Sequence, residues 1–337
     1  MLCKLYNNLK VVNLNNSVFD ISDEYGRRFK TLRISLTSQC NLGCTYCTLS
    51  GKSYDKKNNN KSNNSLSVED LVTAVQSLND ILHLNTVRLT GGEPLLYHDL
   101  IPLIRSLKKI NIHDLKMTTN GYLLAGKIME LKNAGLRNIN ISLDALDQDT
   151  FYKISRRKNL SGILEGIEQA VHTGLGVKIN CVAMKGINDH QVIPLFKYAK
   201  DRNIPIRFLE LMKMGHLQDN YQKFLLTQKE ILKILSNEFS FFSIGRNAGA
   251  TASYWELPGG YQFGIIANDS HPFCSDCDRL RLDSFGNIYG CLSSNTPVSI
   301  RSCIDDKVKL SERLQMVLGH KKIKFSGSTL SMKAIGG

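Results

Sequence analysis

Long apolar runs are absent from this 337-residue sequence. No stretch approaches the roughly 18–20 consecutive apolar residues that a membrane-spanning helix needs. Residues 1–16 lack the apolar core and the small-residue cleavage site of a secretory signal, and they do not form an arginine- and serine-rich presequence. These absences lead us to expect a cytoplasmic protein with no membrane partner.

Acidic residues are also scarce, because 43 lysines and arginines outnumber 30 acidic residues and leave a net charge of +13. Such a charge suggests nucleic-acid binding, but the basic residues are dispersed, and no aromatic-studded basic stripe or known binding module occurs. The densest basic tract, residues 56–64, is rich in asparagine and is typical of a solvated loop. We therefore expect no nucleic-acid partner, and we expect part of the charge to line a pocket for a multiply anionic ligand.

The nine cysteines do not suggest disulfides, because their number is odd and the expected compartment is reducing. Six of them form two triplets, and each triplet lacks the fourth cysteine that would close a zinc site or fully ligate an iron–sulfur cubane. These candidate metal ligands are Cys40, Cys44 and Cys47 in the first triplet, and Cys274, Cys277 and Cys291 in the second. Three thiolates on a four-iron cluster leave one iron free for a ligand that is not protein, so the pattern indicates chemistry.

Two alternatives to this interpretation stay open. Zinc in the first triplet would need a further Cys or His close by, and none occurs before His83. In the second triplet, Cys303 follows Cys291 closely enough to be a fourth ligand. Cys181, in the apolar string VKINCVAM, is instead typical of a buried strand residue.

Short β-rich runs alternate with amphipathic helical stretches from residue 31 to residue 211. Ser67 and Asp70 have the spacing of a capping box, and they predict a helix over residues 67–82. The alternation predicts βαβ units and a parallel sheet, which makes the fold class α/β with an open (βα)6 barrel. The β-rich runs are 31–37, 86–91, 114–120, 138–144, 177–184 and 204–211.

After residue 212 this alternation stops. Residues 227–239 predict one more helix, a glycine-rich region leads to the second triplet, and the chain ends in two glycines. We therefore expect an N-terminal arm over 1–30, a barrel over 31–212, and a separate C-terminal layer over 213–337. In parallel βα folds the sites lie at the C-terminal ends of the strands, and the first triplet follows such an end.

The string CNLGCTYC, with Tyr46 before its last cysteine, resembles the radical S-adenosylmethionine enzymes, as does TGGEP at residues 90–94. The resemblance implies a partial TIM barrel of the radical S-adenosylmethionine type. It implies that a 4Fe–4S cluster on the first triplet chelates S-adenosylmethionine and reduces it to a 5′-deoxyadenosyl radical. The implied S-adenosylmethionine contacts are Tyr46, Gly92, Ser142 and Met212. For Met212 alone, core packing is the better explanation.

The second triplet and the string DRLRL inside it resemble the molybdenum cofactor biosynthesis protein A family, the GTP 3′,8-cyclases. Several further strings fit in order, namely GRRFKTLRISLT, RLTGGEPL, AGLRNINISLDA, KGIND, IRFLELM and the terminal IGG. The resemblance implies a second 4Fe–4S cluster that binds the guanine of GTP. It implies a lyase that forms (8S)-3′,8-cyclo-7,8-dihydroguanosine 5′-triphosphate in molybdopterin synthesis. The residues after Cys47, TLSGKS, depart from the family pattern.

A triphosphate carries about four negative charges and is best bound by several arginines or lysines. The resemblance implies substrate contacts at Arg33, Arg88, Thr118, Lys185, Arg207, Arg279, Leu280 and Arg281. Four of the basic residues lie in or just after strands that end at the same rim, and Arg279 and Arg281 share a face if their run is extended. Catalytic roles are implied for Arg279, Arg281, Gly336 and Gly337.

The resemblance also implies partners, which are a reducing electron donor such as flavodoxin or ferredoxin and a downstream cyclic pyranopterin monophosphate synthase. The resemblance is compatible with a homodimer. Two other functions were weighed. A radical peptide-modifying enzyme with auxiliary clusters would carry more C-terminal cysteines and would not need six arginine and lysine contacts. A zinc-stabilised RNA-binding protein would suit the basic charge.

Overall fold

A computed structural model describes residues 21–48 and 65–336 of the chain. Three features of the sequence lie outside the described residues: the first part of the expected N-terminal arm (1–20), the asparagine-rich tract 56–64, and Gly337.

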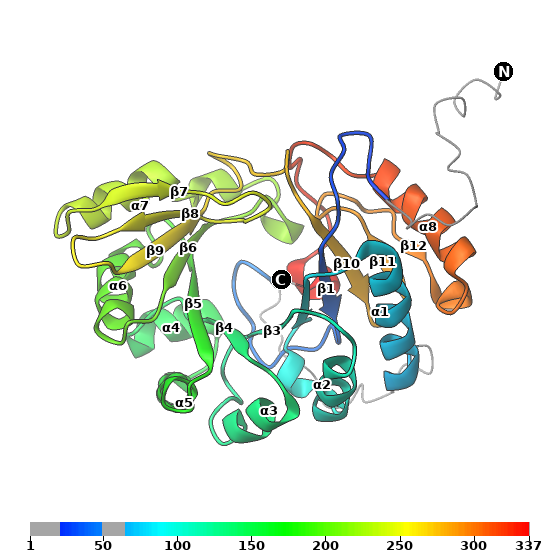
Figure 1. Cartoon of the computed structure of the whole chain (residues 1–337). Helices are drawn as coiled ribbons and strands as arrows, with labels where there is room; N and C mark the ends of the chain where they lie inside the picture. The colour runs from blue at the N-terminus through cyan, green and yellow to red at the C-terminus, as the bar shows by residue number, and fades with distance from the viewer. Residues whose placement is uncertain (1–20, 49–64, 337) are drawn as a thin grey trace.

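The described part of the chain forms a twelve-stranded sheet in the order β12-β11-β10-β1-β2-β3-β4-β5-β6-β9-β8-β7. The strands from β10 to β9 in this order are parallel, and the sheet curves into an open barrel (Figure 1). These parallel strands are β10 (Arg279–Asp283), β1 (Thr31–Ser35), β2 (Thr86–Thr90), β3 (Asp114–Thr119), β4 (Asn138–Ser142), β5 (Gly176–Ala183), β6 (Ile206–Glu210) and β9 (Gln262–Ile266). The predicted α/β barrel is confirmed, but two more parallel strands flank the expected six.

The C-terminal residues do not form the separate layer that the sequence led us to expect. They extend the same sheet at both ends, through β9, β8 (Ser253–Glu256) and β7 (Phe242–Gly245) beside β6, and through β10, β11 (Asn287–Tyr289) and β12 (Val298–Ser299) beside β1. No helix separates β9 from β10, so the βα alternation could not reveal that β9 pairs in parallel with β6 and that β10 pairs in parallel with β1. Residues 267–278 connect these two strands across the open side of the barrel.

Helices cover the outer face of the barrel (Figure 1). They are α1 (Val68–Leu82), α2 (Leu100–Lys108), α3 (Ile128–Ala134), α4 (Gln148–Ser155), α5 (Leu160–His172), α6 (Val192–Asp201), α7 (Gln228–Ser236) and α8 (Lys307–Gly319). The predicted capping box is present at the start of α1, where Ser67 and Asp70 bond each other's backbone N–H groups. The last helix, α9 (Met332–Ile335), lies inside the curve beside β1 and β10 (Figure 1). No helix in the described ranges is long and apolar enough to cross a membrane.

Strand alternation separates an apolar outer face from a polar inner face. In β1, Leu32 and Ile34 are fully buried in the core beneath the helices. Arg33 alternates with them and therefore points to the concave side. The same alternation in β2 buries Val87 and Leu89 and turns Arg88 inward. Polar side chains such as those of Arg33 and Arg88 therefore face the interior of the barrel.

Candidate functional site

The first cysteine triplet lies in a tight turn after β1. The N–H groups of Cys47 and Thr48 both donate to the Cys44 carbonyl at 2.9 Å, which places Cys44 and Cys47 in one turn, and Cys40 is close enough for its charge to act on Cys44. Burial raises the pKa of Cys40 to about 11, and it also raises the pKa values of Cys44 and Cys47. Metal ligation requires thiolates, and a bound metal would favour the deprotonation of such buried thiols, so this loop is a candidate cluster site.

The GlyGlyGlu segment at residues 91–93 is bonded directly to the chain that leads into this turn. The N–H of Gly92 donates to the Thr37 carbonyl at 2.6 Å, and the N–H of Glu93 donates to the Gln39 carbonyl at 2.7 Å. A Cβ on Gly92 would overlap the Gln39 carbonyl, so only glycine permits this approach.

Glu93 is completely buried and has a structural role in this arrangement. Its carboxylate accepts from the N–H of Leu95 at 3.0 Å, the hydroxyl of Thr119 at 2.5 Å and the N–H of Asn120 at 2.7 Å. Burial raises the pKa of Glu93 to about 7, while these hydrogen bonds act in the opposite direction. Asn120 in turn places its amide nitrogen 3.6 Å from the Cys40 sulfur, which ties the ends of β2 and β3 to the triplet.

The three side chains that are implied to contact S-adenosylmethionine lie in three different surroundings. The Tyr46 hydroxyl donates to Asp144 at 2.8 Å, just beyond β4. Ser142 is the half-buried last residue of β4. Met212 packs with Met214 in a cluster that also contains residues of the C-terminal tail. Tyr46 packs in a separate cluster, so this structure does not bring it against Met212.

A row of cations crosses the concave face of the sheet. Arg281 of β10 pairs in register with Arg33 of β1, Arg33 pairs with Arg88 of β2, and Arg88 pairs with Lys116 of β3. Like charges side by side on neighbouring strands destabilise a sheet. At one end of the row Lys116 forms a 2.5 Å ion pair with Asp114, whereas in the described part of the chain the three arginines form no ion pair with an acidic side chain.

The electrostatics of this row support the same conclusion. Burial, and then the charge of Arg279, lower the pKa of Arg33 to about 10. Burial, and then Arg33, lower the pKa of Arg88 to about 9 and also lower that of Arg281. Within the described residues the Nε of Arg33 is buried and has no hydrogen-bond partner. Buried cations without counter-charges are costly, and a bound polyanion would relieve that cost.

The other implied substrate contacts differ in their placement. Thr118 accepts from Arg88 at 3.3 Å, and Arg207 of β6 donates to Asn180 at 2.9 Å. Lys185 is exposed and forms a 2.8 Å ion pair with Glu230 of α7, away from the row. Leu280 is fully buried in the outer core, so its side chain faces away from those of Arg279 and Arg281.

The second triplet borders the same row. Cys274 and Cys277 end the 267–278 connection, and Cys291 follows β11. Burial, and then the neighbouring Cys291 and Cys277, raise the pKa of Cys274. For Cys277, burial is outweighed by the charges of Arg279 and Lys321, which lower its pKa. The three thiols therefore lie together beside Arg279.

The structure bears on both alternatives for the cysteines. Among the described residues, no three His, Cys, Asp or Glu side chains are close enough to hold a single metal ion, and this is true of both triplets. In a cubane each cysteine binds a different iron. Cys303 is buried and directs its thiol to the Ile300 carbonyl at 3.4 Å, with no contact to the second triplet among its described bonds.

The C-terminal tail lies between the cation row and the first triplet. Arg281 donates to the carbonyls of Ile335, at 3.2 Å, and of Gly336. A Cβ on Gly336 would fall 2.7 Å from Thr90 and 3.1 Å from Ser35, at the C-terminal ends of β2 and β1. The charge of Lys333 lowers the pKa values of Cys40 and Cys47 against the larger effect of burial, so α9 is also near the first triplet.

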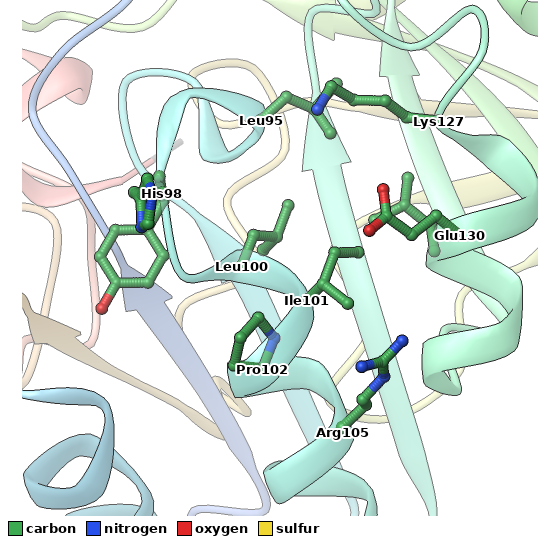
Figure 2. A pocket seen from close by; sticks show the side chains of 10 residues that line it. Leu95, His98, Leu100, Ile101, Pro102, Arg105, Lys127 and Glu130 are labelled. Atoms are coloured by element: carbon green, nitrogen blue, oxygen red, sulfur yellow. The ribbon is translucent and has the colours of Figure 1, made fainter.

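A pocket of about 340 Å³ lies outside the barrel, between α2, α3 and the 3-10 turn Pro94–Leu96 (Figure 2). Its lining includes His98, Arg105, Lys127 and Glu130 and contains none of the residues singled out from the sequence. The candidate site is therefore the concave face of the sheet.

Several polar residues on this face were not predicted from the sequence. Lys116 lies in the run DLKMTT and Asn140 in the run NINIS, at positions that alternate with buried apolar residues. That alternation was a usable signal. Lys321 is different, since it comes from the end of α8 and lies 3.5 Å from the Cys277 sulfur, a contact that no local pattern predicts.

Comparisons with known proteins agree with this geometry. Residues 34–199 match the Radical SAM superfamily, and residues 204–326 match the family Molybdenum Cofactor Synthesis C. The GTP 3′,8-cyclase of Campylobacter fetus subsp. fetus is 39% identical over 307 residues, which cover 90% of this chain and 92% of that protein. The GTP 3′,8-cyclase of Staphylococcus haemolyticus is 40% identical over 308 residues, covering 88% of this chain and 89% of that protein.

Solved structures support the fold. Streptococcus suis SuiB bound to S-adenosylmethionine has a TM-score of 0.61 at 16% identity, over 84% of this chain and 66% of SuiB. Native anSMEcpe with bound AdoMet has a TM-score of 0.58 at 18% identity, over 86% of this chain and 83% of that chain. From its identity to curated relatives across most of its length, the chain belongs to the GTP 3′,8-cyclase family of radical S-adenosylmethionine enzymes.

Proposed function

We propose that this chain converts GTP into (8S)-3′,8-cyclo-7,8-dihydroguanosine 5′-triphosphate in molybdenum cofactor biosynthesis. The observation that carries the proposal is the row Arg281, Arg33, Arg88 and Lys116 on the concave face, beside the second cysteine triplet. A nucleoside triphosphate would supply several negative charges to the three arginines, which form no ion pair with an acidic side chain among the described residues. A peptide substrate would not need them.

Membership of the radical S-adenosylmethionine family implies a 4Fe–4S cluster and S-adenosylmethionine. The donor set of the first triplet fits such a cluster, because it offers three soft thiols in one turn. When bound, the cluster and S-adenosylmethionine supply the one-electron chemistry that starts a radical reaction. Cys40, Cys44 and Cys47 would hold the cluster, and Tyr46, Gly92, Ser142 and Met212 would contact S-adenosylmethionine.

A second 4Fe–4S cluster is part of the proposal and would be held by Cys274, Cys277 and Cys291. Its donor set is again three thiols, and the ammonium of Lys321 beside Cys277 favours a thiolate there. The guanine of GTP would bind next to this triplet, with its phosphates along the cation row.

The protein residues then have distinct tasks. Arg33, Arg88, Arg207 and Arg281 bind and orient the triphosphate, while Thr118 fixes Arg88. Lys185 would join them only by giving up its ion pair with Glu230. The tail around Gly336 lies over the ends of β1 and β2, where it excludes water from the reacting groups. Holding both reactants in one cavity replaces a bimolecular encounter by a positioned one.

The proposal includes the surroundings of the enzyme. We place it in the cytoplasm, reduced by a donor such as flavodoxin or ferredoxin, with its product passing to cyclic pyranopterin monophosphate synthase. Within the chain, we propose an N-terminal arm over 1–30, the six βα units of the barrel over 31–212, and a cluster- and substrate-binding region over 213–337 whose strands β9 and β10 continue the same sheet.

The test is anaerobic reconstitution followed by incubation with GTP, S-adenosylmethionine and a reductant. We expect about eight irons per chain and formation of 5′-deoxyadenosine and the cyclised triphosphate only when GTP is present. ATP in place of GTP serves as the matched control. Colourless zinc-containing protein, or 5′-deoxyadenosine formation that is indifferent to GTP, would refute the proposed function.

A further inference from the structure

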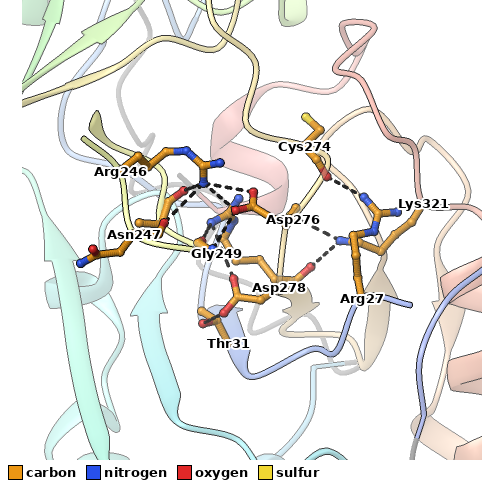
Figure 3. A network of polar contacts seen from close by, with 12 residues as sticks. Arg27, Thr31, Arg246, Asn247, Gly249, Cys274, Asp276, Asp278 and Lys321 are labelled. Carbon is orange, nitrogen blue, oxygen red and sulfur yellow. Dashed lines mark hydrogen bonds and ion pairs between the residues drawn. The ribbon is translucent and has the colours of Figure 1, made fainter. Parts of the chain in front are cut away.

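Two segments from opposite ends of the sheet meet across the open side of the barrel. One is the loop at residues 246–250, which connects β7 to β8. The other is the stretch 274–278, which carries two cysteines of the second triplet and leads into β10. In the strand order, β7 and β8 are separated from β10 by the other parallel strands, and the two segments nevertheless contact each other (Figure 3).

The contact is centred on the carboxylate of Asp276. The guanidinium of Arg246 donates to both of its oxygens, at 3.0 and 2.9 Å, and the N–H of Gly249 donates to it at 3.0 Å. Arg246 also donates to the Ala250 carbonyl at 2.9 Å, which holds the loop in one shape. Asp276 thus fixes the loop 246–250 at two points.

The loop in turn holds Arg279, one of the proposed substrate contacts. The guanidinium of Arg279 donates to the Gly249 carbonyl at 2.7 Å. It lies 3.7 Å from the Asp278 carboxylate and 5.2 Å from the centre of the Phe273 ring. Gly249 therefore connects the Asp276 carboxylate, through its N–H, with the Arg279 guanidinium, through its carbonyl.

Stability alone is a weak explanation for the Arg246–Asp276 pair. Its side chains are 26% and 33% exposed, and partly exposed ion pairs contribute at most about 1 kcal/mol. The position of the pair is more informative. Gly249 alone links Asp276 to Arg279, and Asp276 lies between Cys274 and Cys277 of the second triplet.

We propose that Arg246 is a positioning residue for GTP binding: through Asp276 it fastens the loop 246–250 across the barrel opening and so fixes the guanidinium of Arg279. This inference rests on the proposed function, since the ligand that Arg279 would meet is GTP. Arg246 acts through Arg279 and makes no contact of its own with the substrate.

The test compares Arg246→Ala and Arg246→Lys with the wild type in the reconstituted enzyme. We expect Arg246→Ala to raise the dissociation constant and the KM for GTP about tenfold, which corresponds to about 1.4 kcal/mol. Iron content and kcat at saturating GTP should stay near wild type. Arg246→Lys keeps the charge and should restore most of the affinity. The matched control is Arg202→Ala, which breaks a similarly exposed ion pair with Glu168 on the outer helices and should change nothing.

A double-mutant cycle tests the route through Arg279. If Arg246 acts only by placing that guanidinium, then Arg246→Ala adds no further loss of GTP affinity to Arg279→Ala. Multiplicative losses overturn the inference, as does a wild-type KM for Arg246→Ala or a loss of iron that accounts for its weaker binding. A wild-type enzyme that neither binds nor converts GTP would instead overturn the proposed function itself.

Discussion

Replacing Arg33 by methionine is expected to stabilise the GTP-free protein while weakening its response to GTP. Arg33 is held beside Arg281 and Arg88, and its Nε has no partner among the described residues. A side chain of similar length without charge keeps the packing and removes the buried cation.

The size of the effect follows from the lowered pKa of Arg33. Burial lowers the pKa of Arg33 to about 10, and the difference from an ordinary arginine corresponds to roughly 3 kcal/mol of destabilisation at neutral pH. Because the side chain is half-buried rather than fully sealed from water, we expect about 2 kcal/mol and a rise of a few degrees in Tm. The sign is that of a base whose pKa is lower in the folded state: the penalty is present below about pH 10 and disappears only as the pH rises beyond the unfolded value. The difference should therefore be equal at pH 6 and pH 8.

The assay is thermal unfolding of the reconstituted enzyme with and without GTP. At a hundredfold excess over its Kd, a ligand stabilises by about 2.7 kcal/mol, so GTP should raise the wild-type Tm strongly and that of Arg33→Met much less. Arg105→Met, exposed on α2, is the matched control and should shift neither value by more than about 0.5 kcal/mol. A lower Tm for Arg33→Met without GTP, or an equal gain with GTP, would refute the reasoning.

Three further predictions concern the clusters and the tail. Cys291→Ser should reduce the iron content from about eight to about four per chain, whereas Cys303→Ser should leave it unchanged; equal losses would contradict this assignment. Gly92→Ala should lower the free energy of unfolding by about 2 kcal/mol and reduce the iron content at the first triplet, because the new Cβ overlaps a backbone carbonyl. The control is Gly319→Ala, which has open space around it and should change neither the iron content nor the free energy of unfolding. Deleting the two terminal glycines should abolish turnover and retain all the iron; full activity would exclude a role for the tail.

The sequence predicted the six central strands to within about two residues at each end, because alternation and turn residues are local signals. It could not predict that β9 and β10 continue the parallel sheet. Residues 31 and 279 are neighbours in the register, and nothing in a local window reports that pairing. The expectation of a separate C-terminal layer failed for this reason.

The candidate site divides in the same way. Strand alternation is a sufficient signal for the inward orientation of Arg33 and Arg88. The spacing of the cysteines is a sufficient signal for the two cysteine loops. The orientation of Lys185 toward Glu230 depends on α7, which packs from another part of the chain. The Arg246–Asp276 contact likewise depends on how two distant loops meet. Such long-range contacts follow from tertiary packing and leave no periodic trace in the sequence.

The position of β1 between β2 and β10 has a consequence for how the protein is made. Pairings between residues far apart in the chain form late and slow the folding of a domain. During synthesis β1 therefore remains an edge strand, with unpaired backbone groups open to other chains, until the last quarter of the protein has emerged. A chain that ends before residue 279 would contain the whole first triplet and still lack the neighbour that covers β1. The sheet around the first triplet is thus completed only after β10, which lies beside the second triplet, has been synthesised.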